Sequence, residues 1–473
     1  MRNVILVCLD AVRKDYFEEF APLVNKRADT VYHQARAASC WTVPSHGSMF
    51  TATLPHEHGV HTHPPQFSKI NRTETFLDNF SKHTRIGVSP NAYLSSTYDF
   101  DSLFDEFFEV STNDFQFDDA LSPADLNLAE TGTFGYITAA LRDANPVRSL
   151  ANGILTKLSI YDHLFVDRPW RQIRDAGTKT TLSVAQDYLD THESLDEPVF
   201  MYLNLMEAHS PTVQRGYDTS LYSVPPSRPG AEETPESGNY GISHNTGEYR
   251  QFLQNQRELY RAAIDYLDRH LTAWIDEVQS ATDNETTIVV TADHGENLGF
   301  EEDNDIIGHI TSLTEGVLHV PLVIVNPPDG YPKEVSTLTS NIEIGSLITA
   351  LAKDERYCFS DDPVVAEVIG RAGSIPISEN LTYWDRLIRC IYHDNEKIVW
   401  DSIGTVKRYN FSPTDACNQT FVETDETFPD AEEHRFQTSI LEAKRMAVKQ
   451  ELENTTDSIK ELSKQQLRNL GYL

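Results

Sequence analysis

The sequence predicts an α/β protein with a mainly parallel central sheet, helices on both faces, and a smaller antiparallel part at its C-terminal end. Apolar strand-like runs alternate with helix-like segments over roughly the first 350 residues, which is typical of a parallel sheet covered by helices. Two of these runs stop on an acid. The alternation then gives way to short strand-like runs between turn residues. At 473 residues the chain is too long for one small core, so we expect an α/β domain at 1–355 and an α+β subdomain at 356–473.

The elements follow from the order of these runs. Central strands are expected at 4–9, 199–205, 287–292 and 320–325, because a strand buried on both faces reads as a continuous apolar run. The amphipathic stretch 258–278 predicts a helix, and the segment ending at 347–351 is the last helix of the series. Short strands are expected at 363–368, 387–392 and 397–400, followed by a polar terminal helix from about 438 to 470.

Polar side chains stand where two expected strands end. Asp10 follows the first run, and Asp293 and His294 follow the run 287–292. Open α/β folds bind ligands at the carboxyl edge of their sheet, so these side chains are expected to meet there. With the Thr42 hydroxyl they form a mixed oxygen and nitrogen donor set that suits a divalent cation, with Ca²⁺, Mg²⁺, Mn²⁺ and Zn²⁺ all plausible.

Thr42 is the expected nucleophile. A cation beside a hydroxyl favours loss of its proton, so Thr42 could attack as an alkoxide. Each residue also has a structural interpretation. An acid after a strand is often a cap or turn former, and Thr42 ahead of Pro44 fits a helix N-terminus. The combination in this order favours the site.

Five segments resemble a known family. They are Asp10-Ala11-Val12-Arg13-Lys14-Asp15, Thr42-Val43-Pro44-Ser45-His46, Pro55-His56-Glu57-His58-Gly59-Val60, Glu207-Ala208-His209-Ser210-Pro211 and Asp293-His294-Gly295-Glu296-Asn297-Leu298-Gly299, with a closing Gln466–Leu473. In this order they resemble sulfatases of the alkaline phosphatase superfamily, over essentially the whole chain. The resemblance implies an alkaline phosphatase-like fold and metal-dependent hydrolysis of a small-molecule, glycan or lipid ester.

Two departures from that family change the expected chemistry. Thr42 stands where common sulfatases carry the Cys or Ser that becomes formylglycine, and His46 replaces an Arg. Oxidised threonine would be a ketone, so no formylglycine is expected. Cys40 lies two residues too early and is interpreted as a buried thiol. The threonine version resembles nucleotide pyrophosphatases/phosphodiesterases and lipoteichoic acid synthases, so a phosphate ester or diester is favoured over a sulfate ester.

A further departure concerns the number of metal ions. Ala11 occupies the second acidic position of the family, which favours one cation held by Asp10, Thr42, Asp293 and His294. A two-metal site would have to use Glu207, His209 and His309. The resemblance otherwise implies that His309 faces the transferred group. It places His209 near the leaving group, as general acid or substrate contact.

Two further residues are expected to bind substrate. Arg13 either anchors an anionic group or pairs with Asp15, and both interpretations stay open. His46 lies one turn after Thr42, where a helix N-terminus favours an anion. The histidines at 56, 58, 61 and 63 resemble a metal tract by composition but are interpreted as surface or structural residues.

The charge excludes some partners. A formal charge of −33, from 72 acidic and 39 basic residues, opposes nonspecific nucleic-acid binding and predicts a salt-adapted cytoplasm, as in a halophilic archaeon. The chain begins with strand residues, and no apolar run approaches the roughly 20 residues of a membrane helix. Five cysteines without a paired pattern favour a reduced, cytoplasmic setting.

Three functions fit these residues. The favoured one is a metal-dependent ester hydrolase with Thr42 as nucleophile. A transferase that moves a phosphorus-containing head group onto a glycan or lipid needs the same first half-reaction. A noncatalytic binder of anionic glycans would not need Asp10, Thr42, Asp293, His294 and His309 together.

Overall fold

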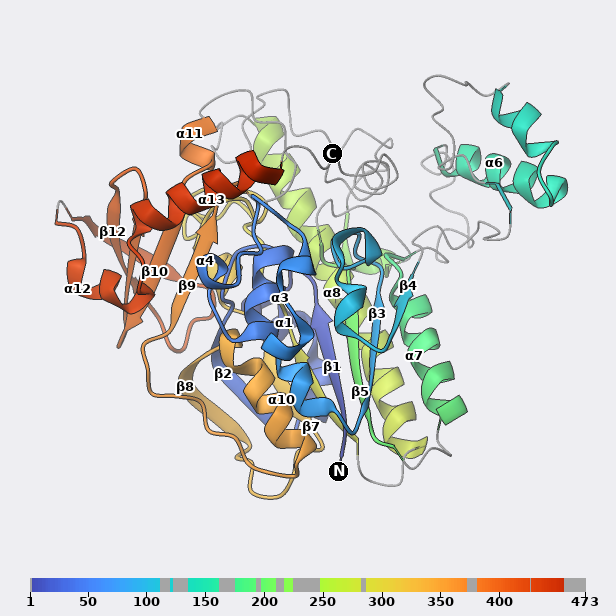
Figure 1. Cartoon of the computed structure of the whole chain (residues 1–473), viewed down its shortest axis with the longest axis horizontal. Helices are drawn as coiled ribbons and strands as arrows, with labels where there is room; N and C mark the ends of the chain where they lie inside the picture. The colour runs from blue at the N-terminus through green and yellow to red at the C-terminus, as the bar shows by residue number, and fades with distance from the viewer. Residues whose placement is uncertain are drawn as a thin grey trace.

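Two β-sheets form the framework of the protein (Figure 1). The computed structural model describes residues 2–110, 120–121, 135–160, 175–192, 197–209, 217–223, 247–281, 286–371, 381–425 and 427–454. Within these ranges, an eight-stranded sheet belongs to the first 340 residues and a five-stranded sheet to residues 365–424. No helix among them is both long and apolar enough to cross a membrane.

The eight-stranded sheet is mostly parallel and carries the site. Its order is β4 (Glu106–Glu109), β3 (Thr84–Ser89), β5 (Val199–Leu205), β1 (Asn3–Leu9), β6 (Thr286–Thr291), β7 (Leu322–Val325), β2 (Thr30–Arg36) and β8 (Glu334–Ser340). Only β7 runs antiparallel to its neighbours, β6 and β2. The central strands β1, β5 and β6 are apolar and almost entirely buried, because helices cover both faces of the sheet.

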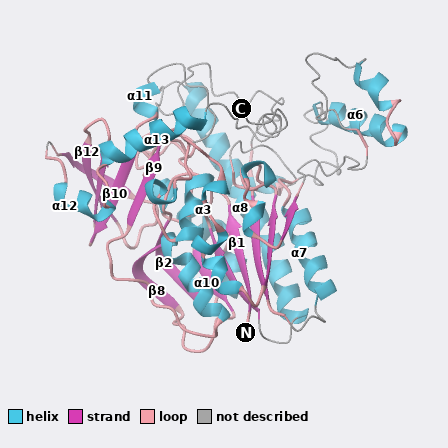
Figure 2. Cartoon of the chain, viewed as in Figure 1, coloured by secondary structure: helices cyan, strands magenta, loops and turns pink. Residues whose placement is uncertain are grey.

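Two groups of helices enclose this sheet (Figure 2). The long helix α8 (Gly247–Ala281) contacts α1 (Lys14–Phe20), α2 (Pro22–Arg27), α7 (Thr178–His192) and strand β6. Helix α10 (Ile344–Ala352) instead contacts α3 (Thr42–Thr51) and strand β1. The described residues also form the helix α6 (Pro146–Ile160) and shorter elements: α4 (Pro55–His58), α9 (Glu315–Leu318) and the 3₁₀ turns Phe67–Lys69, Arg72–Glu74, Phe76–Phe80, Ser96–Tyr98, Asp101–Leu103, Thr219–Leu221 and Asn341–Glu343.

The smaller sheet is antiparallel. It has the order β13 (Gln419–Thr424), β12 (Val406–Phe411), β11 (Glu396–Asp401), β10 (Leu387–His393) and β9 (Val365–Ile369). Trp400 of β11 packs with Phe436, Ile440 and Ala443, so helix α13 (Ile440–Asn454) covers one face. The turns α11 (Leu381–Trp384), α12 (Asp430–Glu433) and His434–Phe436 complete this part.

A buried ionic cluster joins the two sheets. Glu315 of α9 pairs with Arg36 of β2 (2.9 Å) and with Lys397 of β11 (2.8 Å), and it accepts a hydrogen bond from Tyr392 of β10. All four side chains are at most 2% exposed. These charges can be buried because each one is paired with an opposite charge. The ion pairs also fix the position of the smaller sheet against the larger one.

The predicted fold class is confirmed, with local differences. The strand expected at 320–325 is antiparallel rather than parallel. Strands β2, β3, β4, β8, β12 and β13 were not predicted. The expected terminal helix 438–470 is described only as Ile440–Asn454, and its remainder, with the closing Gln466–Leu473, lies outside the described residues.

Candidate active site

The parallel register of β1 and β6 brings two carboxylates together. Cys8 pairs with Thr291, so two residues further along Asp10 stands beside Asp293 at the carboxyl edge of the sheet. On the other side of β1, Leu9 pairs with Leu205, and the backbone N–H of Asp10 donates to the Leu205 carbonyl (2.9 Å). Adjacent strand ends therefore deliver Asp10, Asp293 and His294 to one buried point.

Helix α3 brings Thr42 and His46 to the same edge. Thr42 is the first residue of the helix, as predicted from Pro44, and is 1% exposed. The ring of His46, one turn later, lies with Nδ1 2.8 Å from the Thr42 carbonyl oxygen and 3.6 Å from Asp293 Oδ2. The first turn of α3 thus borders the carboxylates.

Three buried polar atoms face one another without hydrogen-bond partners among the described residues: Asp10 Oδ1, Asp293 Oδ2 and His294 Nε2. They lie within 4.8 Å of one another. His294 Nδ1 is 2.8 Å from the Gly295 carbonyl and must carry the hydrogen there, so Nε2 presents a lone pair. Two carboxylate oxygens and an imidazole lone pair repel unless a proton or a cation lies between them, and this mixed oxygen and nitrogen set fits a divalent ion.

The pKa directions reflect this repulsion. Burial raises the pKa of Asp10, and burial together with the nearby charge of Asp10 raises that of Asp293 well above its usual range. Burial and the neighbouring histidines hold the pKa of His294 well below its ordinary value, so its ring is neutral. A neutral imidazole is the form that binds a metal.

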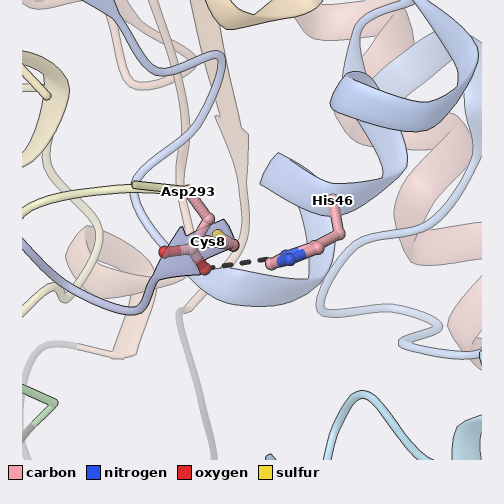
Figure 3. A group of neighbouring side chains, drawn as sticks. All are labelled: Cys8, His46 and Asp293. Atoms are coloured by element: carbon pink, nitrogen blue, oxygen red, sulfur yellow. Dashed lines mark ion pairs between the residues drawn. The ribbon is translucent and has the colours of Figure 1, made fainter. Parts of the chain in front are cut away.

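Figure 3 shows a second group of possible ligands, Cys8, His46 and Asp293, which shares Asp293 with the first group. Its ring nitrogens are already engaged: His46 Nδ1 donates to the Thr42 carbonyl, and Nε2 lies 2.5 Å from the Tyr202 hydroxyl. Burial raises the pKa of the Cys8 thiol well above its usual range. The atoms without hydrogen-bond partners among the described residues therefore lie on Asp10, Asp293 and His294, whereas both ring nitrogens of His46 are engaged.

Two more histidines complete the cluster. His209 Nε2 lies 3.9 Å from Asp10 Oδ1, and the His209 and His309 rings are 4.8 Å apart. His309 also lies 4.6 Å from the His294 ring and pairs through Nδ1 with Glu296 (3.0 Å). Burial alone would lower the pKa of His309, but the Glu296 carboxylate outweighs it and raises the pKa.

The structure places the remaining candidates away from the carboxylate cluster. Arg13 is 2% exposed and pairs with Asp15 and with buried Asp303, so the pairing interpretation describes its contacts. The oxygens of Glu207 accept hydrogen bonds from the Ala176 N–H (2.5 Å) and the Tyr217 hydroxyl (3.0 Å). Cys40 is fully buried, and burial raises its pKa to about 12.

The histidine tract has structural contacts. His56 pairs with Glu367 of β9 (2.9 Å), His63 with Asp385 (2.7 Å), and His61 lies 3.2 Å from the Gln450 side chain of α13. His58 lies 3.2 Å from the Ser48 hydroxyl of α3. These residues connect the loop after α3 to the smaller sheet.

Sequence reasoning missed three residues of the site. Asn91, 1% exposed, donates from Nδ2 to Asp10 Oδ2 (2.7 Å), which leaves Oδ1 facing the cluster. Asn91 follows β3, whose polar residues make the strand hard to predict from the sequence. Without a predicted strand before it, Asn91 was indistinguishable from a turn residue. Tyr202 lies inside the apolar run of β5 and looked like core. Cys8 could have been found, because it lies two residues before Asp10 on the same face of β1.

Comparison with solved structures shows the same fold at low sequence identity. The chain is similar to the phosphonate monoester hydrolase SpPMH from Silicibacter pomeroyi (TM-score 0.56, 14% identity, covering 98% of this chain and 97% of that one). It is also similar to the phosphonate monoester hydrolase of Agrobacterium radiobacter (0.54, 15%, 99% and 96%) and to Ps i-CgsB in complex with k-i-k-neocarrahexaose (0.53, 12%, 99% and 97%). No curated protein sequence matches the chain.

The chain has an alkaline phosphatase-like α/β fold with a buried acid–histidine cluster at the carboxyl edge of its larger sheet. The family follows from the sequence match: the sulfatase family model matches residues 2–354, so the chain belongs to the sulfatase family.

Proposed function

We propose that this sulfatase-family protein is a metal-dependent hydrolase of phosphate esters or diesters, with Thr42 as the nucleophile. The observation that carries the proposal is that atoms of Asp10, Asp293 and His294, beside the first turn of α3, have no hydrogen-bond partner in the part of the chain that the structure describes. A divalent ion held there would supply positive charge that favours the threonine alkoxide and the charge developing on the transferred group. Ca²⁺, Mg²⁺, Mn²⁺ and Zn²⁺ are all compatible with these oxygen and nitrogen ligands.

Thr42, His209 and His309 have the remaining roles in the proposed reaction. The Thr42 oxygen forms a bond to phosphorus as the bond to the leaving oxygen breaks, and His209 is the proposed donor of a proton to that oxygen. Water then attacks the same phosphorus, the bond to Thr42 breaks, and the threonine is restored. His309, held by Glu296, is the proposed contact to an oxygen of the transferred group.

Arg13 and His46 have positioning roles in this proposal. Arg13 connects the start of α1 to Asp303 (2.9 Å), in the segment between Glu296 and His309. His46 is completely buried between Thr42 and Tyr202, so it orients the first turn of α3 and the Asp293 side chain. Neither residue needs to contact the substrate for the arrangement to hold.

A threonine nucleophile favours phosphorus over sulfur. A sulfatase that uses formylglycine transfers the sulfate to one hydroxyl of the aldehyde hydrate, and sulfate then leaves as the C–O bond breaks and the aldehyde re-forms, an exit that threonine lacks. A phosphorylated threonine can instead be hydrolysed by water or transfer its group to an alcohol. The solved structures with the same fold include phosphonate monoester hydrolases, which is compatible with attack at phosphorus.

The test compares aryl phosphate, bis-aryl phosphate and aryl sulfate as substrates, with each divalent metal in turn. Wild type is set beside Thr42→Ala and Thr42→Ser, and an added alcohol acceptor separates transfer from hydrolysis. We expect phosphate or diester turnover that Thr42→Ala reduces by at least about a thousandfold and Thr42→Ser retains in part. Turnover that survives in Thr42→Ala would overturn the assignment of the nucleophile.

A further inference from the structure

Glu207 lies in the turn that carries His209. Strand β5 ends at Leu205, and residues 206–209 form a turn in which the His209 N–H donates to the Met206 carbonyl (3.1 Å). The pairing of β5 with β1 also ends at Leu205, so the sheet does not fix the backbone beyond this point. Contacts outside the sheet must therefore determine where the His209 ring lies.

The carboxylate of Glu207 provides such contacts. Glu207 is 1% exposed, and its Oε1 accepts from the Ala176 N–H (2.5 Å). Its Oε2 accepts from the Tyr217 hydroxyl (3.0 Å), which also lies 3.3 Å from the Glu207 carbonyl oxygen. Two other segments of the chain thereby hold both carboxylate oxygens and the backbone of the same residue.

A second buried acid extends these contacts to two helices. Asp175 accepts from the Gly177 and Lys179 N–H groups at the start of α7 (2.9 Å each). The Tyr266 hydroxyl of α8 also donates to Asp175 (2.8 Å), and the Tyr266 ring packs against the Tyr217 ring at a centroid distance of 5.5 Å. These contacts connect the His209 turn to α7 and α8.

The two polar side chains of the turn have different surroundings. His209 Nε2 lies 3.9 Å from Asp10 Oδ1, and its ring lies 4.8 Å from the His309 ring, so His209 borders the candidate active site. The Glu207 carboxylate instead meets the start of α7 and Tyr217. A proton donor must lie within hydrogen-bond reach of the leaving oxygen, and a displacement of about 1 Å can cost about a hundredfold in rate.

We propose that Glu207 is a positioning residue for His209. Its carboxylate holds the turn, and through the turn it holds the imidazole at the edge of the cluster formed by Asp10, Asp293 and His294. The inference rests on the role proposed for His209, which is to donate a proton to the leaving oxygen. In this proposal Glu207 itself contacts neither the substrate nor the ion.

The experiment compares a phenyl ester with a 4-nitrophenyl ester of whichever class the wild type hydrolyses. Nitrophenolate leaves without a proton, whereas phenolate is a stronger base and depends on a general acid. Displacement of the acid therefore slows the phenyl ester selectively, while a general loss of structure slows both esters. His209→Ala shows the selectivity that complete loss of the acid produces.

Three variants change the contacts of Glu207 to different degrees. Glu207→Leu has a side chain of similar size that accepts no hydrogen bond, and it should lower kcat/KM by about 10–100-fold for the phenyl ester and by about threefold or less for the nitrophenyl ester. Glu207→Gln keeps an acceptor for Ala176 and should restore most of the lost activity. Tyr217→Phe removes one donor and should give a smaller loss with the same selectivity.

Asp268→Asn is the matched control. Asp268 is buried and accepts from the Leu23 and Val24 N–H groups at the start of α2, so it also joins two segments through a carboxylate. We expect it to change the two esters equally or not at all. Thermal unfolding of every variant identifies one that does not fold, and if Glu207→Leu fails to fold, Tyr217→Phe decides by the same measurements.

A second measurement does not depend on turnover. The NMR signal of the His209 ring, identified by its absence from His209→Ala, is recorded on the metal-free protein. It should shift in Glu207→Leu and keep its position in Asp268→Asn. Titration with Mn²⁺ by calorimetry should give the same Kd for Glu207→Leu and the wild type.

Two results would overturn the proposal: an unchanged His209 signal in Glu207→Leu, or equal slowing of both esters by Glu207→Leu where His209→Ala is selective. A Kd for Mn²⁺ weakened by about tenfold or more would place Glu207 at the ion and overturn it equally. If His209→Ala slowed both esters equally, the proposed proton donor would be wrong. The NMR signal would still decide whether Glu207 positions the His209 ring.

Discussion

Replacing Asp293 by Asn should stabilise the metal-free protein. Asp10 Oδ1 and Asp293 Oδ2 lie within 4.8 Å of each other in a fully buried site. At an effective dielectric constant of about 20, two such charges repel by about 3 kcal/mol, and partial protonation of Asp293 reduces this figure. The amide would also offer a hydrogen to His294 Nε2, which lies 3.5 Å from Asp293 Oδ2. We expect a gain of about 1–3 kcal/mol.

The same substitution should remove stabilisation by metal. A metal at 100 times its Kd stabilises the wild type by about 2.7 kcal/mol, or roughly 3–4 °C for a folding unit of about 350 residues. The assay is thermal unfolding in EDTA and in millimolar Mn²⁺ or Mg²⁺. Asp293→Asn should unfold at a higher temperature than wild type in EDTA and show no rise with metal.

A second buried aspartate provides the control. Asp303 is fully buried but pairs with Arg13 (2.9 Å), so Asp303→Asn should destabilise the protein in either buffer by about 1–3 kcal/mol, because Arg13 keeps Asp15 but loses its buried charged partner. If Asp293→Asn instead destabilised the EDTA-treated protein as Asp303→Asn does, the reasoning about a repulsive, cation-requiring cluster would be refuted.

Two further predictions concern particular contacts, and a third concerns the net charge. Asn91→Leu should weaken metal affinity by about 10–100-fold in a calorimetric titration, because Asp10 loses the amide that fixes Oδ2; unchanged affinity would contradict this role. Arg36 and Lys397 hold the pKa of Glu315 at about 2, below its unfolded value. The resulting stability, on the order of 3 kcal/mol, should be complete above about pH 5 and lost as the pH falls towards 2. In denaturant titrations Glu315→Gln should flatten that slope, and an unchanged slope would show that other acids produce it. The charge of −33 predicts a higher unfolding temperature in molar KCl than in 0.1 M KCl, since the screening length falls from about 10 to 3 Å; equal temperatures would show that self-repulsion is unimportant.

The fold was predictable where apolar runs are continuous. β1, β5 and β6 are buried on both faces, so their composition alone indicates them. β3 and β8 were not predicted from the sequence. Arg85, Thr337 and their polar neighbours interrupt the apolar run of each strand at less buried positions of the sheet. The direction of β7 could not be read from its residues either, because an apolar tetrapeptide fits a parallel or an antiparallel neighbour.

The candidate site was predictable to the extent that its residues end strands. Asp10, Asp293 and His294 follow apolar runs, and the register of β1 and β6 brings them together. Asn91 contacts Asp10, which lies 81 positions away in the sequence. Tyr202 contacts His46, which lies 156 positions away. Such contacts leave no local signal, so supporting residues of this kind appear only once the chain is folded.

Detection of phosphate on Thr42 tests the central claim most directly. The metal-loaded protein would be mixed with bis-aryl phosphate, quenched in acid during turnover, digested and analysed by mass spectrometry. The account predicts a phosphorus adduct on the peptide that contains Thr42, absent from Thr42→Ala. Continued turnover of the diester by Thr42→Ala, with no adduct on Thr42 in the wild type, would contradict it.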